Sequence, residues 1–218
     1  MNLLKNFLII FILIILSVSC SKKEKVTILQ EKDLESQMIE LYNEAYNEFL
    51  NNRDTIYAAK KFNEAELIFP QSEWAPVAAL MTAYVYYSDD YYPDAIYELE
   101  RYLKVYPKHK DKVYAHFLLA MCYYEKIVDE KKDLGPLIQA QDKFNFIIKN
   151  YPNSDYALDA TYKLDLIQDY LASKEMYIAL HYMKKKKWIA SINRYKTVVE
   201  QYEKTIYVEE ALHRLVEL

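Results

Sequence analysis

A short sequence phrase recurs four times along this chain of 218 residues and constrains its fold more than any other feature. Three copies end in an aromatic residue followed by proline, and in the fourth copy Glu203 replaces the proline. Counted back from that last position, the residues twelve, eight and five places earlier lie on one face of a helix, which the proline then ends. These positions hold Ala58, Phe62 and Ala65 in the first copy, Ala95, Leu99 and Tyr102 in the second, Ala140, Phe144 and Ile147 in the third, and Ser191, Tyr195 and Val198 in the fourth. Four copies in one register indicate an internal repeat.

Each of these helices is preceded by a second segment with a recurring spacing of small and aromatic residues. Two copies share intervals of three, six and three places: Ala83, Tyr86, Tyr92 and Ala95, then Ala179, Tyr182, Trp188 and Ser191. The third copy carries extra residues around 125–132, and the first copy is one residue longer between Ala45 and Ala58. The pattern resembles the tetratricopeptide repeat, in which small residues let two antiparallel helices approach closely.

We therefore predict an all-α fold, a right-handed α-solenoid of about four tetratricopeptide-like helix pairs plus a C-terminal helix, over residues 36–218. The composition agrees, because Gly135 is the only glycine. Hairpin turns, phosphate-binding loops and nucleophile elbows all depend on the backbone freedom of glycine. Their usual sequences are therefore excluded.

Two segments depart from the plain repeat. One unusually long helix is expected from Tyr156 to Met183, because neither proline nor glycine interrupts it. The last segment, residues 206–218, is expected to form a lone helix that either covers the fourth pair or presents a docking surface. Its apolar residues Ala211, Leu212, Leu215 and Val216 are expected on one side.

The N-terminus has the features of a secretory signal. Lys5 precedes an apolar run from Phe7 to Leu16, and small residues then lead to Cys20. The run is shorter than the roughly 20 residues that a spanning helix needs. A cysteine after small residues resembles the bacterial lipoprotein box, which implies lipidation of Cys20, and the following serine implies sorting to the outer membrane. We predict a signal peptide over residues 1–19 and a lipidated, flexible tether over residues 20–35, with an uncleaved signal anchor as the alternative.

Several classes of site lack support in the sequence. The net charge of −4 does not favour nucleic-acid binding. The four histidines form no familiar metal-ligand pattern, so we expect no metal site, and no cofactor is expected either.

We expect no enzymatic activity: some lytic transglycosylases have helical superhelices, but they add a separate catalytic domain, for which we expect no room after Leu218. Cys122 stands in an apolar helical stretch and is predicted to be a buried, inert thiol.

Two clusters are candidates for contacts with partners. Tyr84, Tyr86 and Tyr87 cannot all face one core from a single helix, so at least one is expected at solvent or in a groove. Exposed tyrosines suit peptide capture, although ordinary packing is the alternative. The four lysines of residues 184–187 are expected to form either a solvated turn or a contact with anionic lipid or an acidic partner.

Together these features resemble the BamD family of outer-membrane assembly lipoproteins. The most specific pieces are Tyr-Pro-Asn-Ser at 151–154 before the long helix, and Trp-Ile-Ala at 188–190 followed by Asn193 and Arg194. The resemblance implies that the N-terminal repeats bind unfolded outer-membrane proteins, with Tyr84, Tyr86 and Tyr87 as candidates. It implies that the C-terminal repeats dock on BamA, with Asn193 and Arg194 as candidates, although an ion pair with a neighbouring repeat is the alternative for Arg194.

The leading hypothesis is thus a non-enzymatic scaffold, anchored by lipid on the periplasmic face of the outer membrane. Its expected partners are a BamA-like barrel insertase, the other lipoproteins of the assembly complex and unfolded outer-membrane protein peptides, with no nucleic acid. The alternative is a tetratricopeptide envelope lipoprotein that scaffolds peptidoglycan enzymes.

Overall fold

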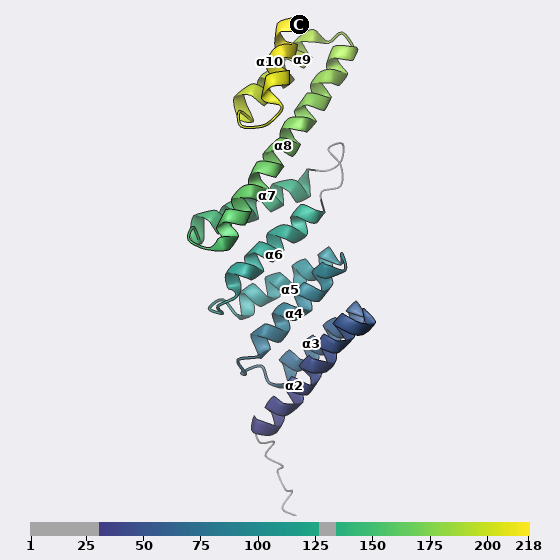
Figure 1. The fold of residues 1–218 in the computed structure, drawn as a ribbon, viewed down its shortest axis with the longest axis vertical. Helices are drawn as coiled ribbons and strands as arrows, with labels where there is room; N and C mark the ends of the chain where they lie inside the picture. Colours follow the sequence, from purple (N-terminus) through teal and green to yellow (C-terminus); the bar gives the residue numbers. More distant parts are fainter. Residues whose placement is uncertain (1–30, 127–133) are drawn as a thin grey trace, which may run out of the picture. The chain divides into compact units, whose positions relative to one another are not determined.

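The computed structural model describes residues 31–126 and 134–218, and within these ranges the chain is built from helices joined by short turns (Figure 1). The elements are α2 (Glu31–Asn47), the π-helix η1 (Glu48–Asn52), α3 (Thr55–Ile68), α4 (Ala75–Ser88), α5 (Tyr92–Val105), α6 (Lys112–Glu125), α7 (Gly135–Asn150), α8 (Asp155–Lys184), α9 (Trp188–Gln201) and α10 (Val208–Glu217). From α3 onward each helix packs against the next along the chain. The predicted all-α solenoid of tetratricopeptide-like pairs is confirmed.

The recurring apolar stripe is the core of every pair. All twelve positions defined by the repeated phrase, on α3, α5, α7 and α9, are exposed by 1% or less. The partner helices contribute an equally buried small residue each, namely Ala45, Ala83, Ala120 and Ala179. Small residues at both contact points let the helix backbones approach closely, which explains why the phrase holds alanine or serine twelve places before its end.

The aromatic residue of each phrase ends its helix at an equivalent corner. Phe69, Tyr106, Tyr151 and Tyr202 are the C-terminal caps of α3, α5, α7 and α9. The carbonyl of each cap accepts a hydrogen bond of 3.0–3.1 Å from the amide three residues later, which belongs to Ser72, His109, Ser154 and Thr205. Because Thr205 keeps this turn without a preceding proline, the fourth corner is formed by the aromatic cap and the backbone turn alone.

The extra residue in the first pair is absorbed by the π-helix η1, which adds one residue to a helical turn. The turn that follows places Arg53 in the left-handed region, five residues before Ala58. Asp90 and Lys186 adopt the same conformation five residues before Ala95 and Ser191, so three pairs share one turn geometry.

The predicted long helix is confirmed as α8, with Ser154 as its N-cap accepting a 3.2 Å hydrogen bond from the Ala157 amide. The first half of α8 packs on α7 and its second half on α9, where the Ser191 hydroxyl donates to the Ala179 carbonyl at 2.8 Å. A single continuous helix therefore joins the third and fourth pairs.

The expected apolar side of the last helix is wrong in part. Ala211 of α10 is buried against α9, and Tyr207, Leu215 and Leu218 pack beside it at helical spacing. Leu212 and Val216 lie outside this stripe and are exposed. Tyr207, Ala211 and Leu215 are spaced four residues apart and form the side of α10 that is covered by α9. Leu212 and Val216 have the same spacing but form a different side of the helix.

The predicted signal peptide over residues 1–19 and the predicted lipidation at Cys20 lie outside the described residues. Helix α2 begins at Glu31, ahead of position 36 where we expected the repeat domain to start, and the compact unit that holds the helix pairs runs from Leu34 to Leu218. Within the described ranges, no helix combines the length and the apolar character needed to cross a bilayer.

Cys122 of α6 is fully buried, and burial raises the pKa of its thiol to about 12. Because the thiolate is the reactive form, we expect iodoacetamide at about pH 8 to leave Cys122 unmodified in the folded protein. Complete labelling is expected after unfolding in urea. Mass spectrometry of the peptide that contains Cys122 measures both states, and labelling of the folded protein at the rate of an exposed thiol would contradict the prediction.

Candidate functional site

The three candidate tyrosines of α4 point to different neighbours. All three are half-buried and pack against the core formed by α4, α5 and α6. Tyr86 also contacts the core of the first pair, whereas Tyr87 also contacts the core that includes α7. Burial is the main cause that raises the pKa of both hydroxyls. Tyr86 and Tyr87 therefore join successive helix pairs, and Tyr84 is the one of the three that borders a hollow.

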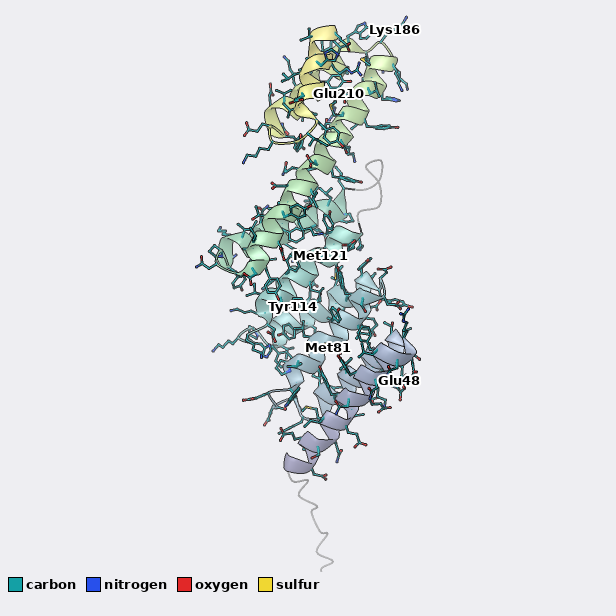
Figure 2. All side chains as sticks on the ribbon, in the orientation of Figure 1. Glu48, Met81, Tyr114, Met121, Lys186 and Glu210 are labelled. Carbon is teal, nitrogen blue, oxygen red and sulfur yellow. The ribbon has the colours of Figure 1, made fainter. Side chains whose placement is uncertain are left out.

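The hollow has a volume of about 370 Å³ and lies between α4 and the start of α6. Its walls are mostly apolar or aromatic, formed by Val77, Leu80, Met81, Tyr84 and Tyr114, with Asp111 as the acidic group. Met81 and Tyr114 are labelled in Figure 2 on the two helices that border it. A site of this kind can hold a large apolar or aromatic side chain and place one carboxylate near a polar group of the same ligand.

Further aromatic rings extend from this hollow along the first helices of consecutive pairs. We call Phe49, Tyr84, Tyr114, Phe117 and Tyr156 the aromatic track. Ring centroids are 6.1 Å apart for Phe49 and Tyr84, 5.7 Å for Tyr114 and Tyr156, and 5.4 Å for Phe117 and Tyr156. These rings lie on η1, α4, α6 and α8 and are half-buried, and Tyr84 and Tyr114 are linked through the hollow that both line.

Tyr114 is neutral where it borders the hollow. Burial, and secondarily the neighbouring Tyr84 and Tyr156, raise the pKa of Tyr114, so its hydroxyl stays protonated near neutral pH. A neutral phenol can donate or accept a hydrogen bond while its ring contacts an apolar side chain. The Tyr114 side chain can therefore contact both the apolar and the polar groups of an amphipathic segment.

The second pair of candidates lies on α9. Asn193 is exposed, on the same helix face as the exposed Ile189 four residues earlier. The Arg194 guanidinium donates to both carboxylate oxygens of Glu175 on α8, at 3.0 and 3.2 Å. This ion pair joins the two helices of the fourth pair, rather than neighbouring repeats, and leaves Arg194 only half-exposed.

A buried ion pair that sequence reasoning missed joins the first two helix pairs. Glu66 of α3 is only 3% exposed and accepts two hydrogen bonds from Arg101 of α5, at 2.8 and 2.6 Å. The Tyr106 hydroxyl donates a third at 2.8 Å, and the Arg101 Nε donates to Glu98 at 2.8 Å. Since every polar group of the cluster has a partner, we assign it to the stability of the array and not to binding.

Comparison with known proteins decides the family. The model of the YfiO family, described as outer membrane lipoprotein, matches residues 34–218, which cover all the helix pairs. The chain belongs to the YfiO family of outer membrane lipoproteins. Among the residues described for this YfiO chain, no three metal-ligating side chains lie close enough to hold an ion.

The YfiO chain is also similar to curated proteins named outer membrane protein assembly factor BamD. It is 36% identical to the protein of Caulobacter vibrioides over 90% of this chain and 63% of the relative. It is 36% identical to that of Rickettsia prowazekii over 85% of this chain and 73% of the relative, and 35% identical to that of Neisseria gonorrhoeae over 79% and 68%. The chain thus spans less than two thirds of the length of the Caulobacter relative.

Proposed function

We propose that this chain is a non-enzymatic scaffold of the outer-membrane β-barrel assembly machinery, anchored by lipid at Cys20 on the periplasmic face of the outer membrane. The support for this role is the YfiO family match and the assembly-factor names of the relatives. The observation that carries the binding role is the hollow beside Tyr84, because it adjoins a series of aromatic rings on successive first helices.

The clients are unfolded outer-membrane proteins, which reach the scaffold as extended segments. Side chains on one face of such a segment repeat about every 6.5 to 7 Å, and strands of outer-membrane barrels alternate apolar and polar residues with aromatic girdles. The three ring separations within the aromatic track, 6.1 Å for Phe49 and Tyr84 and 5.7 and 5.4 Å from Tyr156 to Tyr114 and Phe117, are slightly shorter than this repeat. Alternate client side chains can therefore contact successive rings, with one inserted beside Tyr84.

Docking on the insertase BamA is assigned to the outer surface of α9 around Asn193. Its side chain is exposed, so its amide group can donate and accept hydrogen bonds with a partner. Arg194 contributes mainly by holding α9 against α8 through Glu175. The client surface and the partner surface then lie on different helix pairs, which lets both be occupied together.

Site-specific photo-crosslinking in cells tests both surfaces. We expect p-benzoylphenylalanine at Tyr84 to crosslink newly made outer-membrane proteins, and the same group at Asn193 to crosslink BamA. The matched control is Tyr97, an exposed tyrosine of α5 outside the aromatic track, which should crosslink neither. Mass spectrometry identifies the products.

Each result assigns a role. Client crosslinks at Tyr97 as strong as those at Tyr84 would reject the hollow as the client site. Crosslinks from Asn193 to peptidoglycan synthases or hydrolases, without BamA, would reject the assembly role and favour the scaffold of cell-wall enzymes.

A further inference from the structure

The strongest segregation of charge in the chain lies around the turn between α8 and α9. No acidic residue occurs between Glu175 and Glu200, whereas this segment holds four consecutive lysines, residues 184–187, as well as Arg194 and Lys196. The chain as a whole carries a net charge of −4. A local cluster of one sign on a protein of the opposite sign creates a local field that attracts an anionic surface.

The four lysines are free to make such a contact. All four are exposed, and in the described part of the chain none forms an ion pair. Of the three glutamates of the neighbouring α10, Glu210 and Glu217 contact Arg214 at 3.4 and 2.9 Å, and Glu209 forms no ion pair with these lysines. Glu175 is likewise held by Arg194. The positive charge of the turn is therefore not neutralised within the molecule.

The backbone holds this turn in a fixed shape. The amide of Lys187 donates to the Tyr182 carbonyl at 3.0 Å, and that of Lys186 donates to the Met183 carbonyl at 2.9 Å. Lys186, labelled at the end of the α8–α9 hairpin in Figure 2, has φ of 55°, a conformation that glycine or asparagine adopts more readily. An ordered turn presents its charges without a large loss of backbone entropy on binding.

Two exposed apolar residues stand directly beside these charges. Trp188 is 48% exposed and Ile189 is 76% exposed at the start of α9. In the third repeat the position of Trp188 holds Leu137, which is buried in the core. Tryptophan is enriched where a protein meets the headgroup region of a bilayer, and lysine is attracted to anionic lipid there.

We propose that the α8–α9 turn, consisting of residues 184–189, docks on an anionic phospholipid surface, with the lysines at the phosphates and Trp188 and Ile189 among the headgroups. A bilayer fits better than an acidic peptide because none of these residues lines any of the three hollows described in the structure. A protruding turn with no groove suits a broad surface. The proposal adds a second membrane contact to the lipid anchor and does not depend on client binding.

Tryptophan quenching by brominated lipid tests the contact. The full chain is purified from membranes and reconstituted into vesicles of phosphatidylcholine alone or with about 30% phosphatidylglycerol. Because the chain has two tryptophans, Trp74→Phe leaves Trp188 as the only reporter. We expect quenching on anionic vesicles to exceed that on neutral vesicles by about twofold or more. Salt at about 0.5 M, which shortens the screening length to about 4 Å, should remove the difference.

Two variants with the same change in net charge show whether quenching depends on the lysines of this turn or on the charge of the whole protein. Each lysine near an anionic surface increases partitioning onto that surface about fivefold. Changing residues 184–187 together from Lys to Gln should therefore reduce the quenching on anionic vesicles to that on neutral vesicles. The control variant has an equal change in charge and should keep the stronger quenching on anionic vesicles. It changes four other exposed lysines to Gln, namely Lys104, Lys108, Lys110 and Lys149. Circular dichroism confirms that both variants are folded.

Two outcomes would overturn the proposal. One is equal quenching of Trp188 on neutral and anionic vesicles. The other is a shift of Trp188 emission with soluble polyglutamate but none with anionic vesicles, which would assign the turn to an acidic protein surface instead.

Discussion

Replacing Arg101 with methionine is expected to lower the free energy of unfolding by about 3 to 5 kcal/mol. The substitution leaves the Glu66 carboxylate, 3% exposed, without the two hydrogen bonds of 2.8 and 2.6 Å that the guanidinium donates. Only the Tyr106 hydroxyl would remain to solvate this buried charge. Urea denaturation followed by circular dichroism measures the loss.

Arg194→Met is the matched control, since Arg194 also pairs with a glutamate on a neighbouring helix, at 3.0 Å. The Arg194 side chain is half-exposed, so water replaces much of the lost interaction and the expected change is about 0 to 1 kcal/mol. The double variant Glu66→Leu with Arg101→Met removes both charges and should recover part of the stability. Equal losses for Arg101→Met and Arg194→Met would show that burial of the Glu66 pair does not matter.

The repeat register could be predicted from sequence because it depends on local spacing. Alanine or serine followed by an apolar residue four and seven places later specifies one helix face, and all twelve of these positions are buried. The first three corners could be predicted because a proline follows the aromatic cap there, and proline cannot continue a helix from its interior, although it is tolerated in the first turn of α4, α5 and α7. The long α8 could also be predicted, since its segment contains no residue that breaks a helix.

Contacts between helix pairs could not be predicted in the same way. Glu66 and Arg101 are 35 residues apart, and a charged residue next to a helix core usually faces solvent, so only the packing of α3 against its neighbours shows that Glu66 is buried. The aromatic track was missed for a related reason. Phe49, Tyr84 and Tyr114 occupy different positions in their repeats, so no shared spacing marks them.

The C-terminal helix shows where helical periodicity is ambiguous. Leu212 and Val216 are spaced as a stripe, but so are Tyr207, Ala211 and Leu215, and only the second set contacts α9. Two overlapping apolar stripes on one short helix are distinguished by the partner helix, which the sequence of α10 does not describe.

The core stripe itself predicts the other large effect on stability. Ile147→Ala is expected to lower the free energy of unfolding by about 2 to 5 kcal/mol, because Ile147 is fully buried on α7 among Phe144 and the residues of α8. The loss combines transfer of the side chain with the cavity that it leaves. Urea denaturation by circular dichroism again measures the change.

Ile138→Ala provides a control with the same substitution on the same helix, since Ile138 is 51% exposed. Its expected effect lies within about 0.5 kcal/mol, because little apolar surface is lost and alanine favours the helix. If the two variants lost equal stability, the stripe defined by the repeated phrase would not be the core of the array. A large loss confined to Ile147 would instead tie stability to that register, because residues nine positions apart on one helix would differ only in the face they occupy.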